Sequence, residues 1–108
     1  MTDRTIEPNL PADRSLVIVD DDRSFLTRLG RALELRGFEV RMAASVAEGR
    51  DTIRTAPPAF AVVDMRLEDG NGLDVIEELS RVRPDARVVV LTGYGNIATA
   101  VTAVIASR

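Results

Sequence analysis

The sequence predicts an α/β domain built on a doubly wound parallel sheet. Four short apolar runs, rich in β-branched residues, recur along the chain, and a segment with helical periodicity follows each of them. Strict alternation of this kind places parallel strands in the middle and helices on both faces. With 108 residues the chain has room for one such domain.

The first strand and helix follow a polar leader. Residues 1–14 include two prolines among polar side chains and are expected to form a flexible leader. The run at 16–19 is apolar throughout, which is typical of a strand buried on both faces. A helix at 24–36 follows, and Gly37 ends it.

Each later strand is also followed by a predicted helix. Ser45 precedes the second helix and Glu48 stands three residues on, which indicates a capping box. The predicted segments are a strand at 39–42 and a helix at 46–55, a strand at 60–63, a turn at 69–72 and a helix at 73–83, then a strand at 88–91 and a last helix carrying Ile97, Val101, Val104 and Ile105.

Composition excludes several kinds of site. The chain has no cysteine and no histidine, so thiolate metal sites, disulfides and a histidine-based triad are excluded. The formal net charge of −3 argues against direct nucleic-acid binding by this segment. No apolar run is long enough to cross a membrane, and we expect no membrane partner and a cytoplasmic protein. All 14 basic residues are arginine.

Polar side chains follow three of the predicted strands. Asp20, Asp21 and Asp22 follow the first strand, Asp64 the third and Thr92 the fourth. The carboxyl ends of parallel strands meet at one edge, where such folds bind ligands. Carboxylates this close repel one another, and a donor set made of oxygen alone favours Mg²⁺. Magnesium beside an attacking carboxylate suits phosphoryl transfer.

Other interpretations of these residues stay open. An acidic triplet by itself is more often a helix cap, while Asp64 alone fits a solvated loop and Thr92 an ordinary strand-end hydroxyl. Their location together at one edge of the predicted sheet favours a site. The segment 93–98 formally fits a dinucleotide-binding fingerprint. That fingerprint belongs on the first strand-helix unit, and a glycine turn explains the segment better.

Three motifs make the sequence resemble the receiver domain of bacterial response regulators, from Ser15 to about Val104. They are VIVDDDRSFL, VVDMRLEDGNGLDVI and VVVLTGYGNIATAVTAV, and the last two are closest to the redox-responding RegA type. The resemblance implies a flavodoxin-like receiver fold with strand order 2-1-3-4. It also implies a role in two-component signal transduction and transcription regulation, with DNA contacted only through a separate output domain.

The resemblance assigns roles to individual residues. Asp64 is expected to be both the phosphoacceptor and a metal ligand, with Asp21 a direct Mg²⁺ ligand and Asp20 a ligand acting through a metal-bound water. The carbonyl of Arg66 completes the protein ligands, and Thr92 is the switch hydroxyl. The phosphoryl donor is a sensor histidine kinase. The chain is therefore not an enzyme beyond self-catalysed phosphorylation and dephosphorylation of its own aspartate.

The sequence departs from the family pattern at two places. Leu67-Glu68 stands where many receivers have Met-Pro. The family's fifth strand, which carries a lysine, and its fifth helix are absent, and the chain has no lysine to replace that one. We therefore expect a truncated receiver at 15–108 with impaired phosphorylation, which forms a homodimer or swapped oligomer through its exposed edge. The alternative is a non-signalling dimerisation or decoy fragment.

Overall fold

The structure is a computed structural model that describes residues 12–91. Its elements are β1 (Ser15–Val19), α1 (Arg23–Leu35), β2 (Glu39–Ala43), α2 (Val46–Thr55), β3 (Phe60–Asp64), β4 (Arg66–Leu67), β5 (Gly70–Asn71), α3 (Gly72–Val82) and β6 (Arg87–Leu91). The four long strands form one parallel sheet in the order β2-β1-β3-β6. Because β6 is the fourth long strand, this confirms the predicted fold class and strand order.

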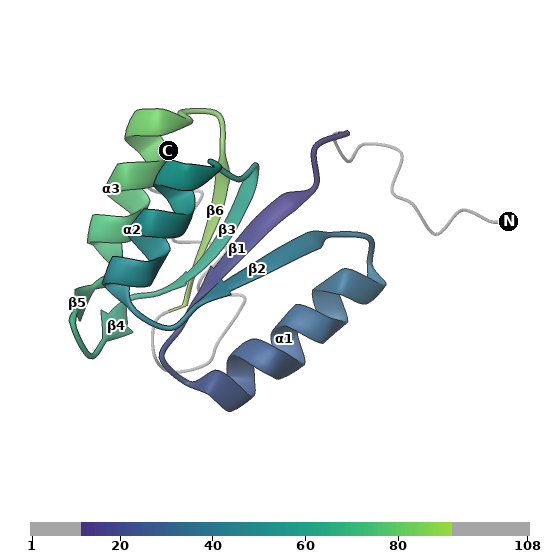
Figure 1. The fold of residues 1–108 in the computed structure, drawn as a ribbon, viewed down its shortest axis with the longest axis horizontal. Coiled ribbons are helices and arrows are strands. Elements are labelled where there is room, and N and C mark those ends of the chain that lie inside the picture. The colour runs from purple at the N-terminus through teal and green to yellow at the C-terminus, as the bar shows by residue number, and fades with distance from the viewer. Residues whose placement is uncertain (1–11, 92–108) are drawn as a thin grey trace, which may run out of the picture.

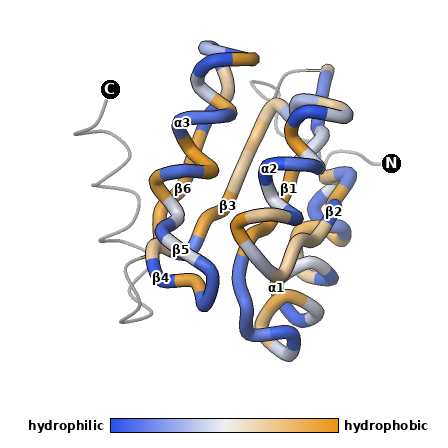
Figure 2. The backbone as a smooth tube through the Cα atoms, turned by 60° about the vertical axis from the view of Figure 1, so that its left-hand side comes forward, coloured by the Kyte–Doolittle hydropathy of each residue, from blue (hydrophilic) through white to orange (hydrophobic). Residues whose placement is uncertain are grey.

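The sheet lies between two helical layers, with α1 on one face and α2 and α3 on the other (Figure 1). Side chains alternate along β1, so that Leu16 and Ile18 join the core beneath α1 while Val17 and Val19 join the core beneath α2 and α3. All four are buried. After Ser15, strand β1 is therefore apolar and buried from Leu16 to Val19, as the run predicts. Strands β3 and β6 are also largely hydrophobic in Figure 2.

Local signals set the ends of α1. The side chain of Asp22 accepts a hydrogen bond from the N–H of Phe25 and caps the first turn. At the other end Gly37 has a φ of 98°, a left-handed conformation that favours glycine, and donates its N–H to the carbonyl of Glu34. The helix thus ends where the sequence predicts.

The Ser45 cap predicted for α2 is present, and the return bond expected of a capping box goes to Ala44, the residue before the cap. Ser45 accepts a hydrogen bond from the N–H of Glu48, and the Glu48 carboxylate accepts one from the N–H of Ala44. A third cap was not predicted: the Asp69 carboxylate accepts hydrogen bonds from the first two N–H groups of α2. These bonds lower the pKa of Asp69, and they join the segment after β3 to α2.

The segment after Asp64 differs most from the prediction. Instead of a simple turn at 69–72, it forms a small antiparallel hairpin in which Leu67 pairs with Gly70 and Arg66 with Asn71. Strands of two residues are too short to leave a period-2 pattern, which explains why the sequence did not reveal them. Asn71 then caps α3 by accepting a hydrogen bond from the N–H of Leu73.

Several predictions lie outside the described residues. Most of the leader, Thr92, the segment 93–98 and the last predicted helix belong to this group. Just inside the boundary, Asp13 accepts hydrogen bonds from Ser15 and from the guanidinium of Arg83. Among the helices of residues 12–91, none combines the length and apolar character that a membrane span requires.

Candidate metal centre

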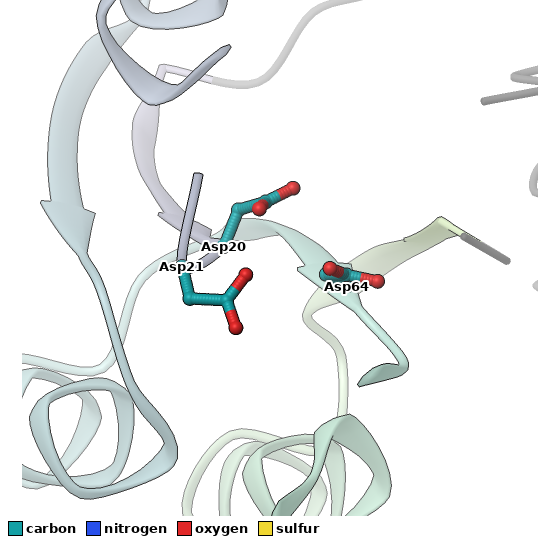
Figure 3. A group of neighbouring side chains, drawn as sticks. All are labelled: Asp20, Asp21 and Asp64. Atoms are coloured by element: carbon teal, nitrogen blue, oxygen red, sulfur yellow. The ribbon is translucent and has the colours of Figure 1, made fainter. Parts of the chain in front are cut away.

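Three aspartates meet at the carboxyl edge of the sheet. Asp20 and Asp21 directly follow β1, and Asp64 is the last residue of β3. The two strands are adjacent and in register, with Val19 opposite Val63. Each aspartate contributes a carboxylate oxygen, and these oxygens all lie within 4.8 Å of one another (Figure 3). The structure therefore brings together the three carboxylates that the sequence predicts as metal ligands.

Backbone N–H groups hold all three carboxylates. The N–H of Asp22 donates to Oδ1 of Asp20 at 2.9 Å, and the N–H of Arg66 donates to Oδ1 of Asp64 at 3.1 Å. These two bonds are local, since each donor lies two residues after its acceptor. The third is not local: the N–H of Glu68 donates to Oδ2 of Asp21 at 3.0 Å. Each carboxylate thus accepts at least one backbone N–H and keeps acceptor positions for other partners.

The electrostatics of the cluster disfavour three negative charges. Burial raises the pKa of Asp20, and repulsion from Asp64 and Asp21 adds to it, although the N–H of Asp22 acts in the opposite direction. Burial also raises the pKa of Asp64, and repulsion from Asp21 adds to this effect, while the N–H and guanidinium of Arg66 oppose it. Both shifts have the sign that a bound cation would relieve.

The donor set fits a hard divalent cation. It consists of carboxylate oxygens, which Mg²⁺ and Ca²⁺ prefer. Asp20 is buried, while Asp21 and Asp64 are half-buried, so the cluster is partly shielded from water yet open to an incoming group. A cation here would neutralise repulsion between the carboxylates and still leave positions for water or substrate oxygens.

The structure divides the aspartate triplet between two roles. Asp22 caps α1, as the capping interpretation suggests, whereas Asp20 and Asp21 join Asp64 at the edge of the sheet. Residue type alone does not tell which of the three consecutive aspartates caps the helix and which join the acidic cluster. Their order does, because only the residues nearest the end of β1 remain level with the end of β3.

Close packing of α3 against β3 helps to place Asp64. Gly72, the first residue of α3, donates its N–H to the carbonyl of Met65. A Cβ atom at Gly72 would lie 2.2 Å from the backbone oxygen of Asp64 and 2.9 Å from Cγ1 of Val63. Glycine is therefore required for the helix to begin this close to the end of the strand.

The predicted roles of two other site residues, Arg66 and Thr92, stay predictions. Arg66 lies in β4, where its N–H binds Asp64, and the role of its carbonyl as a ligand stays a prediction. Thr92 is the residue after the last one described, so its predicted role also stays a prediction.

Sequence reasoning missed a buried acidic residue, Glu78, between α2 and α3. The Glu78 side chain is 3% exposed and forms ion pairs with Arg50 at 3.4 Å, with Arg54 at 3.2 Å and with Arg81. The hydrogen bond from Arg54 and the three positive charges lower the pKa of Glu78. Two of these arginines come from α2, and only the spacing of Glu78 and Arg81 could have been noticed in the sequence.

Comparisons with known proteins agree with this geometry. Residues 16–107 match the family described as response regulator receiver domain. Over 95 residues the chain is 65% identical to the photosynthetic apparatus regulatory protein RegA of Cereibacter sphaeroides, covering 88% of this chain and 52% of that protein. It is 63% identical over 92 residues to the acid tolerance regulatory protein ActR of Rhizobium meliloti, covering 85% and 47%. The chain spans about half the length of these curated relatives.

Solved structures show the same fold. A response regulator protein from Burkholderia pseudomallei, described with a phosphorylated aspartic acid, a calcium ion and citrate, superposes with a TM-score of 0.73 at 41% identity, covering 86% of this chain and 55% of that one. A CheY-like receiver domain protein from Methanospirillum hungatei also gives 0.73 at 30% identity, covering 88% and 76%.

Proposed function

Because the chain belongs to the response regulator receiver domain family, we propose that Asp64 is a phosphoacceptor that takes a phosphoryl group from a sensor histidine kinase. The observation that carries the proposal is the cluster of carboxylate oxygens within 4.8 Å, contributed by Asp20, Asp21 and Asp64. The Burkholderia relative, described with a phosphorylated aspartic acid and a calcium ion, supports both the chemistry and the need for a divalent cation.

In this proposal Asp64 is the nucleophile. Its Oδ1 accepts the N–H of Arg66, which orients the carboxylate and leaves Oδ2 to attack phosphorus. A bond forms between that oxygen and phosphorus while the bond from phosphorus to the kinase histidine nitrogen breaks, and the histidine keeps the electron pair. The product is an aspartyl phosphate on this chain and a free histidine on the kinase.

The remaining aspartates supply the cation site. Asp21 would hold Mg²⁺ directly and Asp20 would hold it through a water, with Asp64 and the carbonyl of Arg66 as further ligands. When bound, Mg²⁺ neutralises the carboxylates and the oxygens of the incoming phosphoryl group. Thr92 is proposed as the hydroxyl that responds to the aspartyl phosphate.

We also propose that phosphorylation of this 108-residue chain is slow. Independently, we propose that the chain forms a homodimer. These 108 residues include no lysine, so they supply no lysine ammonium group to the phosphoryl oxygens. Within the described sheet β6 is an edge strand, and its three valines are half-buried. DNA contact through a separate output domain and a cytoplasmic location belong to the same proposal and depend on the family alone.

The test is incubation with acetyl phosphate and Mg²⁺, followed by intact-mass and peptide mass spectrometry. We expect slow, partial addition of one phosphoryl group to Asp64 and none in D64N. Rapid stoichiometric phosphorylation would contradict the impairment. No phosphorylation at Asp64 would contradict the phosphoacceptor role and favour a decoy or dimerisation fragment. Sedimentation analysis that finds only monomer at high concentration would contradict the dimer.

A further inference from the structure

The hairpin formed by β4 and β5 touches both the acidic cluster and α2. At its tip, the N–H of Glu68 donates to Oδ2 of Asp21 at 3.0 Å, although the two residues are 47 positions apart in the sequence. The neighbouring carboxylate of Asp69 binds the first two N–H groups of α2 at 2.8 and 3.1 Å. The tip is therefore anchored on two sides, and one anchor is a carboxylate of the metal centre.

We propose that the backbone N–H of Glu68 is a positioning group that fixes the Asp21 carboxylate for cation binding. This inference rests on the proposed function, because it concerns how the same centre is prepared for its cation. The contact is made by the backbone of Glu68 and not by its side chain. Receivers with Met-Pro in place of Leu67-Glu68 cannot make it, because proline has no backbone N–H, so the proposed positioning group is particular to chains with this departure.

The three carboxylates differ in how they are held. Asp20 and Asp64 each accept an N–H from a residue two positions later, so their own local chain orients them. The donor to Asp21 comes from another element. The orientation of Asp21 therefore depends on a tertiary contact, and among these three carboxylates it is the one held by the tip of the hairpin.

Fixing Asp21 should strengthen cation binding. The N–H uses one acceptor position of Oδ2 and leaves Oδ1 and a further position of Oδ2 for a metal or its waters. A carboxylate that is already oriented loses less side-chain entropy when a cation binds. In metal sites generally, hydrogen-bond partners of the ligands are worth roughly 10- to 100-fold in affinity.

Proline at position 68 removes this N–H while the backbone can keep its shape. Leu67 pairs with Gly70, so Glu68 and Asp69 form a two-residue loop, and no non-glycine residue of the described chain has a positive φ. Proline accepts negative φ, and the extended backbone of a β4 residue suits the position before it. E68A is the matched control, since it also loses the carboxylate but keeps the N–H.

The first measurement is calorimetric titration of the whole chain with Mg²⁺ alone. We expect E68A to bind about as tightly as the wild type, and E68P to bind about tenfold more weakly than E68A. Equal affinities of E68P and E68A, or tighter binding by E68P, would overturn the positioning role. A wild type that binds no Mg²⁺ would instead overturn the proposed function, and the positioning role with it.

The second measurement needs no metal. Amide hydrogen exchange of Glu68 is followed in chelator-treated wild type, in D21A and in D51A, which removes an exposed aspartate of α2. We expect exchange at Glu68 to be at least tenfold faster in D21A and unchanged in D51A. Equal exchange in D21A and wild type would show that this N–H does not hold Asp21, and would overturn the proposal even if Mg²⁺ binds.

Discussion

The acidic cluster at the edge of the sheet and Glu78 between α2 and α3 are both shielded carboxylate sites, yet their surroundings differ. Backbone N–H groups hold Asp20, Asp21 and Asp64, and burial raises the pKa of Asp20 and of Asp64. Three arginines hold Glu78, and they lower its pKa. The protein thus compensates the charge of Glu78 with its own cations, while the edge cluster retains a net repulsion that an outside cation would relieve.

The comparison shows that a shielded carboxylate can be a structural residue or part of a candidate cation site, depending on which groups surround it. Glu78 ties α2 to α3 and needs no partner beyond the chain, so it is a structural residue. The edge cluster costs stability when the metal is absent, and a fold retains such a cost where a site uses it. Figure 3 shows the side chains of Asp20 and Asp21 beside that of Asp64 at the end of β3.

Helix α3 connects the two regions, and a substitution at its start should disturb only one of them. We expect G72A to lower the free energy of unfolding by about 2 kcal/mol, because the added methyl group would overlap the Asp64 backbone. It should also weaken Mg²⁺ binding, since Asp64 must move. Urea denaturation and Mg²⁺ titration measure the two effects.

G30A is the matched control for this substitution. A Cβ at Gly30 would approach the flexible side chain of Met42, with the sulfur at 3.3 Å, and no backbone atom. We expect a change of less than about 1 kcal/mol and unchanged Mg²⁺ affinity. If G72A behaved like G30A, the close approach of α3 would not determine the position of Asp64.

Neutral substitutions should change stability in opposite directions at the two sites. In chelator at pH 7, we expect D64N to raise the free energy of unfolding by roughly 0.5–1 kcal/mol, a modest gain because half-exposed charges are screened by water. E78Q should lower it, because three guanidinium groups then face no negative charge. Thermal or urea unfolding of the two variants measures both effects.

The pH dependence follows from the signs of the two pKa shifts. The pKa of Asp64 is raised above 3.8 in the folded protein, so folding favours the protonated carboxyl group. Its contribution to the free energy of unfolding is full below pH 3.8 and is lost as the pH rises through the raised pKa. The gain from D64N should therefore appear over that window. The pKa of Glu78 is lowered below 4.5, so the E78Q penalty should be full above 4.5 and fade as pH falls through the lowered pKa. If D64N and E78Q changed the free energy of unfolding in the same direction at neutral pH, the proposed difference between the two sites would be contradicted.

The sequence was sufficient for features that depend on nearest neighbours. Apolar runs and helical spacing predicted every long element between β1 and β6, with ends within about one residue of those observed. The positions of Asp20, Asp21 and Asp64 at strand ends predicted the acidic cluster, because parallel strands carry their carboxyl ends to one edge.

Features that depend on contacts distant in sequence were not predictable. The bond from Glu68 to Asp21 spans 47 positions, and the ion pairs that bury Glu78 reach it from α2 across 24 and 28 positions. A single sequence carries no signal for such pairs, because each residue is an ordinary surface type. The hairpin that presents Glu68 has strands of two residues, below the length at which periodicity is visible.

The most direct test of the cation site is paramagnetic broadening by Mn²⁺, which replaces Mg²⁺ at oxygen-rich sites. We expect a substoichiometric amount to broaden the amide signals of Asp20, Asp21 and the segment from Asp64 to Glu68 first, and to leave Glu78 sharp. Excess Mg²⁺ should reverse the broadening. Broadening centred on Glu78, or spread evenly over exposed acids with no preference for the edge of the sheet, would contradict the account.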